Sequence, residues 1–418
     1  MSNVKVAAVK HETASIPHNV PRDRVYNIDM FALEGIEEGY HEAWMRIKKP
    51  NMPDLIWTPC NGGHWVATNG RTIAEIYSDP TRFSSEVIFM PKEAGEKYEM
   101  VPTRMDPPEH TPYRKGLAAA LGVAMVRRFE EKARKFSVEL IDSFMDKGSC
   151  DFAKEYAEKF PVLVFMALAD LPLSDVPLLT HYAYLMTRPE GATADERAAT
   201  LERGNKGFFD YVDPIIKERR GKGGSDLISL MSDLNIDGEP ISHDKAKGLV
   251  GLLLLAGLDT VVAMLNFVMV YLAQHPEKVA ELRDNPKKII TGAEELFRRF
   301  PVISEGRMIA KDIDYDGVHL TRGEMVLMPT ALSGLDESLY PNPWEVDFDR
   351  KAAGHITFGG GVHRCAGALF ARLELVTTLE EWLKRIPEFS LRSEQKVVYS
   401  TGMVANVANV SLVWPVKK

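Results

Sequence analysis

The sequence contains little cysteine, and its cysteines are scattered. Only three occur among 418 residues, namely Cys60, Cys150 and Cys365, and none belongs to a CxxC pair. An odd and sparse set excludes a disulfide framework and is typical of a reducing compartment, so we expect a cytoplasmic protein. A zinc site is also disfavoured, because no second cysteine lies near Cys365 in the sequence.

A strong charge of one sign is also missing. Lys and Arg total 51 against 59 Asp and Glu, which gives a formal net charge of -8 and argues against nucleic acid as the main partner. The first residues hold no apolar stretch of the kind found in signal peptides. With 45% hydrophobic and 26% charged residues, the composition predicts a globular protein with a sizeable dry interior.

One long apolar run stands out in this otherwise ordinary composition. Residues 248–274 carry a single charged side chain, Asp259. Length alone would make this run a candidate membrane span. No second span and no basic flank accompanies it, so we interpret it as a helix buried inside the protein and expect no membrane association.

Periodicity divides the chain into two kinds of segment. Residues 1–105 are rich in proline and extended pieces, with Asn61-Gly62 as a hairpin turn. Residues 106–418 are mostly helical in pattern, apart from a long stretch with little periodicity over 333–364. We therefore predict a mainly α protein with small peripheral β-sheets, folded as a single domain over 1–418.

The glycine-rich segment FGGGVHRCAG ends this aperiodic stretch. Its glycines permit positive φ and a close backbone approach to a flat ligand. Cys365 precedes a predicted helix whose free N–H groups favour a thiolate, so we expect a depressed thiol pKa. Such a sulfur is a metal ligand or a nucleophile, although a structural cysteine beside a flexible loop is the alternative.

The order of residues in this segment resembles the haem-binding segment of the cytochrome P-450 monooxygenases. The resemblance implies a triangular helical prism with a long central helix, and haem b (iron protoporphyrin IX) as cofactor. Cys365 would be the axial ligand of the haem iron, whose thiolate favours O–O cleavage. Phe358, Gly359 and Gly367 would surround the cofactor.

The apolar run gains a role from the same resemblance. Its segment Ala256-Gly257-x-Asp259-Thr260 is similar to the oxygen-activation segment of the family, in which an acid and an alcohol deliver protons to bound oxygen. A threonine hydroxyl can also bond a preceding carbonyl and open the helix locally. From the residues alone, Asp259 could equally form a buried ion pair while Thr260 packs.

Two further groups of residues match family positions. Glu295 and Arg298 match the ExxR pair that clamps the cysteine loop, but Glu345 stands near where a third, arginine partner is usual, so that partner is unassigned. Buried haem propionates need cations. The family's propionate partners correspond to His110, Arg114, Arg307 and His363.

The segments DLIWTPCNGGHW and EAGEKYEMVPTRMDPPE extend the resemblance to the camphor 5-monooxygenases of bacteria. It implies hydroxylation of camphor or a similar monoterpenoid ketone with O₂ and two electrons, with Tyr98 as hydrogen-bond donor to the ketone. The alternatives are another terpenoid such as an ionone or norisoprenoid, a haem-binding sensor, a peroxygenase, and a hydrolase using His363 as base. The substrate wall would be formed by Phe89, Thr103, Leu252, Leu255, Ala256, Ile303, Met403 and Val404.

Electrons must come from a separate protein, because the chain shows no flavin- or iron–sulfur-binding segment. The resemblance implies a [2Fe–2S] ferredoxin, reduced by a flavin-dependent reductase, and a monomeric enzyme. It also implies a possible K⁺ site formed by the carbonyls of Glu86, Gly95, Glu96 and Tyr98. The ferredoxin would dock on Arg114, Lys115, Lys351 and Arg364, with Arg372 nearby.

Overall fold

The fold is described from a computed structural model. It covers residues 13–95, 100–187, 194–351, 354–394 and 396–416. Glu96 and Tyr98, which the sequence assigns to the cation and substrate sites, lie outside the described residues. Everything below refers to the described part of the chain.

Helices form most of the structure, as predicted from the periodicity. Among the helices, the most extensive packing is between α7 and α8 and between α5 and α14. The helices are α1 (Tyr40–Met45), α2 (Gly70–Ser78), α3 (Lys92–Gly95), α4 (His110–Ala120), α5 (Val123–Asp142), α6 (Phe160–Leu168), α7 (Val176–Thr187), α8 (Ala194–Arg219), α9 (Leu227–Ser232), α10 (His243–Gln274), α11 (Pro276–Asp284), α12 (Lys288–Arg299), α13 (Thr330–Gly334) and α14 (Ala368–Arg385).

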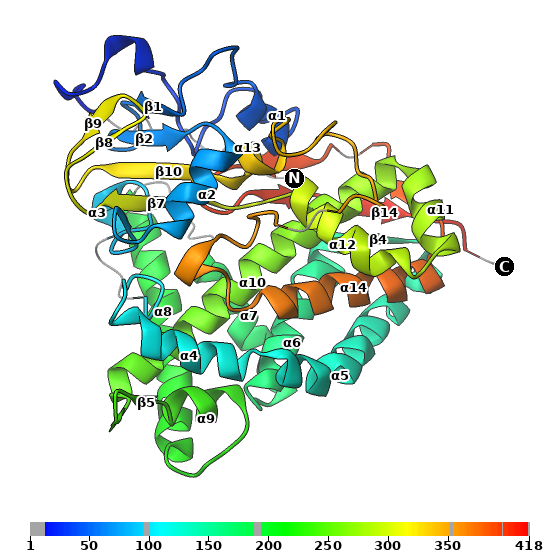
Figure 1. Ribbon diagram of the computed structural model, residues 1–418. Helices are drawn as coiled ribbons and strands as arrows, with labels where there is room; N and C mark the ends of the chain where they lie inside the picture. The colour runs from blue at the N-terminus through cyan, green and yellow to red at the C-terminus, as the bar shows by residue number, and fades with distance from the viewer. Residues whose placement is uncertain (1–12, 96–99, 188–193, 352–353, 395, 417–418) are drawn as a thin grey trace.

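The apolar run forms the central helix α10. The hydroxyl of Ser242 caps its first turn by accepting from the Lys245 N–H, and Pro276 follows its end. Within the described residues, α10 is the one helix long and apolar enough to cross a membrane. Of the 18-residue stretch of α10 that is most apolar, 53% is buried inside the protein. Figure 1 shows α10 passing through the middle of the molecule, and it packs against α6, α7, α8, α9 and α14.

The largest sheet has five strands in the order β1-β2-β10-β7-β3. Its pairs are antiparallel except for β2 with β10. The predicted Asn61-Gly62 turn joins β1 to β2, and both residues have positive φ (53° and 87°). The strands are β1 (Leu55–Thr58), β2 (His64–Ala67), β3 (Phe83–Ser84), β7 (Ser304–Ile309) and β10 (Met325–Pro329).

The other sheets are small and peripheral, as predicted. One has three strands in the order β11-β14-β4, and three are two-stranded: β12-β13, β5-β6 and β8-β9. Their strands are β4 (Ser149–Asp151), β5 (Asn235–Ile236), β6 (Glu239–Pro240), β8 (Ile313–Tyr315), β9 (Val318–Leu320), β11 (Ser390–Leu391), β12 (Val398–Ser400), β13 (Asn406–Ala408) and β14 (Ser411–Val413).

The cysteine loop, residues 358–367, lies between the aperiodic stretch and α14. Its backbone passes close to the end of α2. A Cβ on Gly361, whose φ is 61°, would stand 2.6 Å from the Tyr77 carbonyl oxygen, so only glycine fits there. The glycines therefore determine the path of the loop. This path places Cys365 at the wall of an internal cavity, three residues before α14 begins.

Candidate active site

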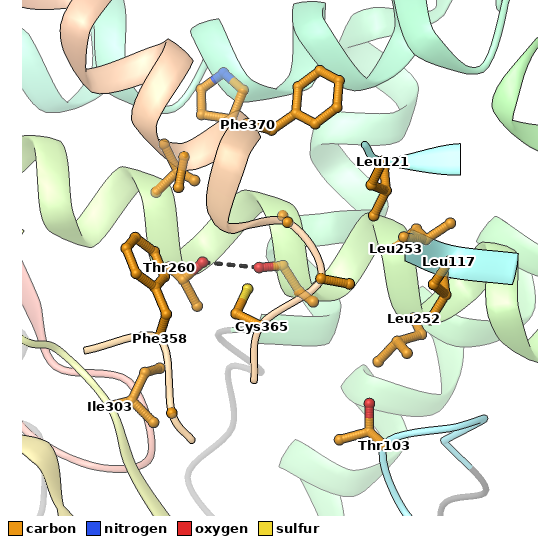
Figure 2. Close-up of a pocket in the computed structure, with 18 of the residues that line it drawn as sticks. Thr103, Leu117, Leu121, Leu252, Leu253, Thr260, Ile303, Phe358, Cys365 and Phe370 are labelled. Atoms are coloured by element: carbon orange, nitrogen blue, oxygen red, sulfur yellow. Dashed lines mark hydrogen bonds between the residues drawn. The ribbon is translucent and has the colours of Figure 1, made fainter. Parts of the chain in front are cut away.

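A cavity of about 340 Å³ lies between α10 and the cysteine loop, within the size range of small-molecule sites. Figure 2 shows Cys365 of the cysteine loop and Thr260 of α10 among the residues that line this space. Apolar residues of α4, α6 and α10 form much of the remaining wall, among them Leu117, Val164, Phe165, Leu252 and Leu253. The cavity therefore brings the Cys365 sulfur and the Thr260 hydroxyl into one mostly apolar enclosure.

Cys365 lies three residues before α14. Its N–H donates to the Phe358 carbonyl over 2.8 Å. The expectation of a depressed thiol pKa is wrong for this structure, because burial raises the pKa more than the Gly367 N–H and the Arg114 charge lower it. A thiolate here therefore requires a bound cation or metal to stabilise it.

Thr260 and Asp259 are neighbours on α10. The Thr260 hydroxyl donates to the Ala256 carbonyl over 2.8 Å and lines the cavity. The expected local opening of the helix is not seen, since α10 continues as α-helix through residues 256–260. Asp259 is half-buried and lies beside the wall. The Asp259 carboxylate therefore belongs to the residue next to Thr260, whose hydroxyl lines the cavity.

Three of the four expected propionate partners reach the cavity. His110, Arg114 and His363 line it, and the imidazole rings of His110 and His363 lie 4.3 Å apart between centroids. Burial is the main cause that lowers the pKa of His110 to about 4, assisted by the charges of His363 and Arg114. Arg307 does not line the cavity, because its guanidinium is bonded to the Gly306 carbonyl and to Glu305 behind the Tyr77 ring.

The residues present fit a haem. The buried Nε2 of His363 has no partner within hydrogen-bond distance among the described residues, since Asp106 Oδ1 is 3.9 Å away, and the nitrogen can therefore donate to an added acceptor such as a propionate. Burial lowers the pKa of Arg114, which is the cost of holding a cation at this edge without a counter-anion. A thiol, an apolar slot and a cationic edge are the donor set that a flat, dianionic metal porphyrin requires. Phe358, Gly359 and Gly367 of the cysteine loop line the same slot.

The ExxR pair is completely buried. Arg298 donates to both carboxylate oxygens of Glu295 over 2.7 and 2.8 Å, and to the carbonyls of Gly334, Pro343 and Glu345. The partner that the sequence left unassigned is Arg350, whose Nε donates to Glu295 Oε1 over 3.0 Å. Glu345 contributes only its carbonyl, since its side chain is exposed. These bonds tie α12 to the segment that leads into the cysteine loop.

The expected substrate-wall residues divide into two groups. Thr103, Leu252, Ala256 and Ile303 line the cavity. Phe89, Leu255, Met403 and Val404 do not line it, although Val404 pairs with Ile303 directly behind the wall. Spacing along the chain indicates which segments approach the cavity, but the packing of each segment decides which side chains face it.

The expected cation site is only partly described. The Glu86 carbonyl accepts a hydrogen bond of 2.6 Å from Arg104 Nε, and Gly95 ends α3. Of the expected docking residues, Arg364 belongs to the cysteine loop and its carbonyl accepts from Arg114, and the side chains of Lys115, Lys351 and Arg364 are exposed. Arg372 differs from them, because it is bound to Glu294.

Three titratable wall residues were not singled out in the sequence. Tyr77 and Glu305 line the cavity near the cationic edge. Glu374 of α14 is fully buried, its Oε2 has no partner among the described residues, and burial raises its pKa to about 8. Glu305 and Arg307 are two residues apart in β7, so their side chains lie on the same face of the strand, and this spacing could have indicated Glu305. For Glu374, the available signal was a glutamate between Leu373 and Leu375 in α14.

Known proteins show the same fold and similar sequences. The cytochrome P450 family model matches residues 196–404. The solved structures of CYP101J2 and of cytochrome P450 CYP101C1 are 38% and 35% identical to this chain, each with a TM-score of 0.89. They cover 97% and 96% of this chain and are themselves covered completely. A probable cytochrome P450 127A1 of Sinorhizobium fredii is 29% identical over 99% of this chain and all of its own length.

These matches agree with the predicted fold and with haem b as the cofactor. They also explain why a cysteine, a cationic edge and a threonine meet around one flat apolar space. The chain belongs to the cytochrome P450 family of haem monooxygenases.

Proposed function

We propose that this monooxygenase hydroxylates camphor or a similar monoterpenoid ketone, using O₂ and two electrons. The single observation that carries the proposal is the cavity itself, in which Cys365 and Thr260 face a small, mostly apolar space. A relative from Pseudomonas, 28% identical over 87% of its length, carries the name cytochrome P450-terp, and this name agrees with a terpenoid substrate.

Cys365 would hold the haem through its sulfur. His110, Arg114 and His363 would bind the propionates, and the apolar wall would exclude water from the remaining space. When bound, the haem would supply the activation of O₂ for insertion into a C–H bond. Because burial raises the pKa of the free thiol, a thiolate at Cys365 would need the positive charge of a bound metal.

Asp259 and Thr260 move the protons that oxygen activation consumes. The hydroxyl of Thr260 donates to the Ala256 carbonyl, which fixes its oxygen at the cavity wall and leaves that oxygen able to accept another hydrogen bond. Asp259 lies one residue away and supplies the acid. The acid thus remains outside the apolar space while the hydroxyl faces it.

The substrate is held chiefly by shape. Leu252, Ala256 and Ile303 present apolar surface, and Thr103 adds one hydroxyl. We propose Tyr98 as the donor to the substrate ketone on the family resemblance. One polar anchor in an apolar cavity orients a rigid bicyclic ketone so that one C–H bond faces the cofactor.

The electrons come from a [2Fe–2S] ferredoxin that is reduced by a flavin-dependent reductase. The exposed cations Lys115, Lys351 and Arg364 near the cysteine loop would attract an acidic partner. We propose that the enzyme works as a monomer in the cytoplasm. The Glu86 carbonyl accepts one hydrogen bond from Arg104 Nε, and its second lone pair is available to a K⁺ ion.

The test is a titration of purified holoenzyme with camphor, other bicyclic monoterpenoid ketones and an ionone. Camphor or a close bicyclic ketone should shift the Soret band through a change of spin state, and turnover with a ferredoxin system should yield one main alcohol. Tyr98→Phe should weaken binding of the ketone and broaden the product distribution, while binding of a hydrocarbon of the same shape stays unchanged. A Soret band that responds to the ionone but not to the bicyclic ketones would overturn the substrate assignment.

A further inference from the structure

The described structure contains a second carboxylate clamp beside the ExxR clamp. Glu294 precedes Glu295 on α12, and the two carboxylates point to different partners. Glu295 binds Arg298 and Arg350, whereas Glu294 binds Arg372 of α14 and His355. Arg372 donates to both oxygens of Glu294, over 2.5 and 2.9 Å, and His355 Nε2 lies 3.2 Å from Oε2.

Arg372 also contacts Phe358, which begins the cysteine loop, and Ala368, which directly follows it. Its guanidinium carbon lies 4.6 Å from the centre of the Phe358 ring, and its Nη1 is 3.1 Å from the Ala368 carbonyl oxygen. The ring of Phe358 packs against Phe297 as well, with centroids 4.8 Å apart. A planar guanidinium that binds a carboxylate and stacks on an aromatic ring at the same time is a fixed arrangement that lysine cannot reproduce.

Phe358 transmits this arrangement to the sulfur. Its carbonyl accepts the 2.8 Å hydrogen bond from the Cys365 N–H, so a movement of Phe358 moves the backbone of the ligand residue. Arg372 thus places a positive charge against Phe358, the residue whose carbonyl binds the Cys365 N–H. Glu294 opposes that charge at close range, and hydrogen bonds from His355 and Arg372 lower its own pKa to about 2 although burial raises it.

We propose that Glu294 and Arg372 are positioning residues that set the electron density and the placement of the Cys365 sulfur. Arg372 fixes Phe358 and supplies a positive charge near the sulfur, and Glu294 holds Arg372 in place and balances that charge. Groups just outside the ligand shell of a metal tune it in this way. The sequence indicated Arg372 as a docking cation, but its guanidinium faces Glu294 and the cysteine loop. The inference rests on family membership and not on the identity of the substrate.

Opposite charge changes give the proposal its test. In purified holoenzyme, Arg372→Met should lower the haem reduction potential, because a positive charge that favours the reduced state is removed. Glu294→Gln should raise the potential, because the charge of Arg372 is left unbalanced. Arg372→Lys should keep the potential close to that of the parent, while a larger share of the reduced carbonyl adduct shows the short-wavelength band of a lost thiolate.

A control on the same helix separates tuning from general loss of stability. Arg385→Gln breaks a comparable ion pair with Glu381, far along α14 from the cysteine loop, and should lower the melting temperature without moving the potential. If Glu294→Gln or Arg372→Met takes up no haem, Arg372→Lys still tests the positioning role, because it keeps the charge and loses the bidentate, stacked geometry, so its reduced carbonyl adduct should still show the larger share of the short-wavelength band. Potentials that stay unchanged in all variants, or that move equally in Arg385→Gln, would overturn the proposal.

Discussion

Arg350 donates from its Nε to Oε1 of Glu295 over 3.0 Å. The same oxygen accepts from Arg298, and the Glu295 carboxylate is fully buried. The single carboxylate of Glu295 on α12 therefore binds two arginines from different segments. The rigid path of the chain into the cysteine loop depends on this shared atom.

Arg350→Met should destabilise the holoenzyme by about 3–5 kcal/mol, because it removes one member of a buried ionic network. It should also speed the loss of haem. Denaturant unfolding followed at the Soret band measures both effects. As a matched control, Lys206→Ala removes an exposed ion pair with Asp210 and should change stability by less than about 1 kcal/mol. Equal effects of the two substitutions would contradict the role of the clamp.

Thr260→Ala should separate electron consumption from product formation. Without the hydroxyl at the cavity wall, O₂ is still reduced, but product formed per electron pair falls by about 100-fold, the lower end of the contribution of a positioned proton donor. Thr260→Ser keeps the hydroxyl and serves as the control. The measurement compares oxygen uptake, peroxide and hydroxylated product. Full coupling in Thr260→Ala would refute the assigned role.

Glu374 should make stability depend on pH. Burial raises its pKa to about 8 in the folded protein from an ordinary value of 4.5, so the folded state retains a proton that the unfolded state releases. The free energy of unfolding therefore falls as pH rises from 4.5 to 8, by about 1.4 kcal/mol for each unit of pKa difference at most. Glu374→Gln should be close to neutral at pH 4.5 and stabilising at pH 8, as measured by denaturant melts.

The exposed Glu388 provides the comparison for Glu374, because Glu388→Gln should shift the melts equally at both pH values. A Glu374→Gln variant whose advantage does not grow with pH would show that the carboxylate is ionised inside the folded protein.

Arg364→Glu should slow electron transfer from an acidic ferredoxin by about tenfold or more at low salt, because steering by complementary charge is reversed. The difference from the parent enzyme should shrink as salt is added. Lys206→Glu, on α8, is the control and should leave the rate unchanged. Rates that do not respond to salt in either enzyme would remove the electrostatic basis of docking.

The sequence predicts elements better than contacts. The end of α10, the turn at Asn61-Gly62 and the start of the last helix follow from proline, glycine and periodicity, which act locally, whereas α10 starts at His243, before the apolar run that begins at residue 248. The wall of the cavity depends on how helices cross, so Val164 and Phe165 of α6 gave no signal of their place there. Arg350 and Arg372 look like ordinary surface charges in the sequence, and only packing turns them inward.

The order of strands in the large sheet has a consequence for biosynthesis. Strand β10 (Met325–Pro329) lies between β2 (His64–Ala67) and β7 (Ser304–Ile309), and it pairs with both. The hairpin of β1 and β2 therefore leaves the ribosome early. The edge of β2 that pairs with β10 stays uncovered until more than three quarters of the protein has been made. An exposed strand edge invites association with other chains, so nascent chains of this enzyme should depend on chaperones until β10 emerges.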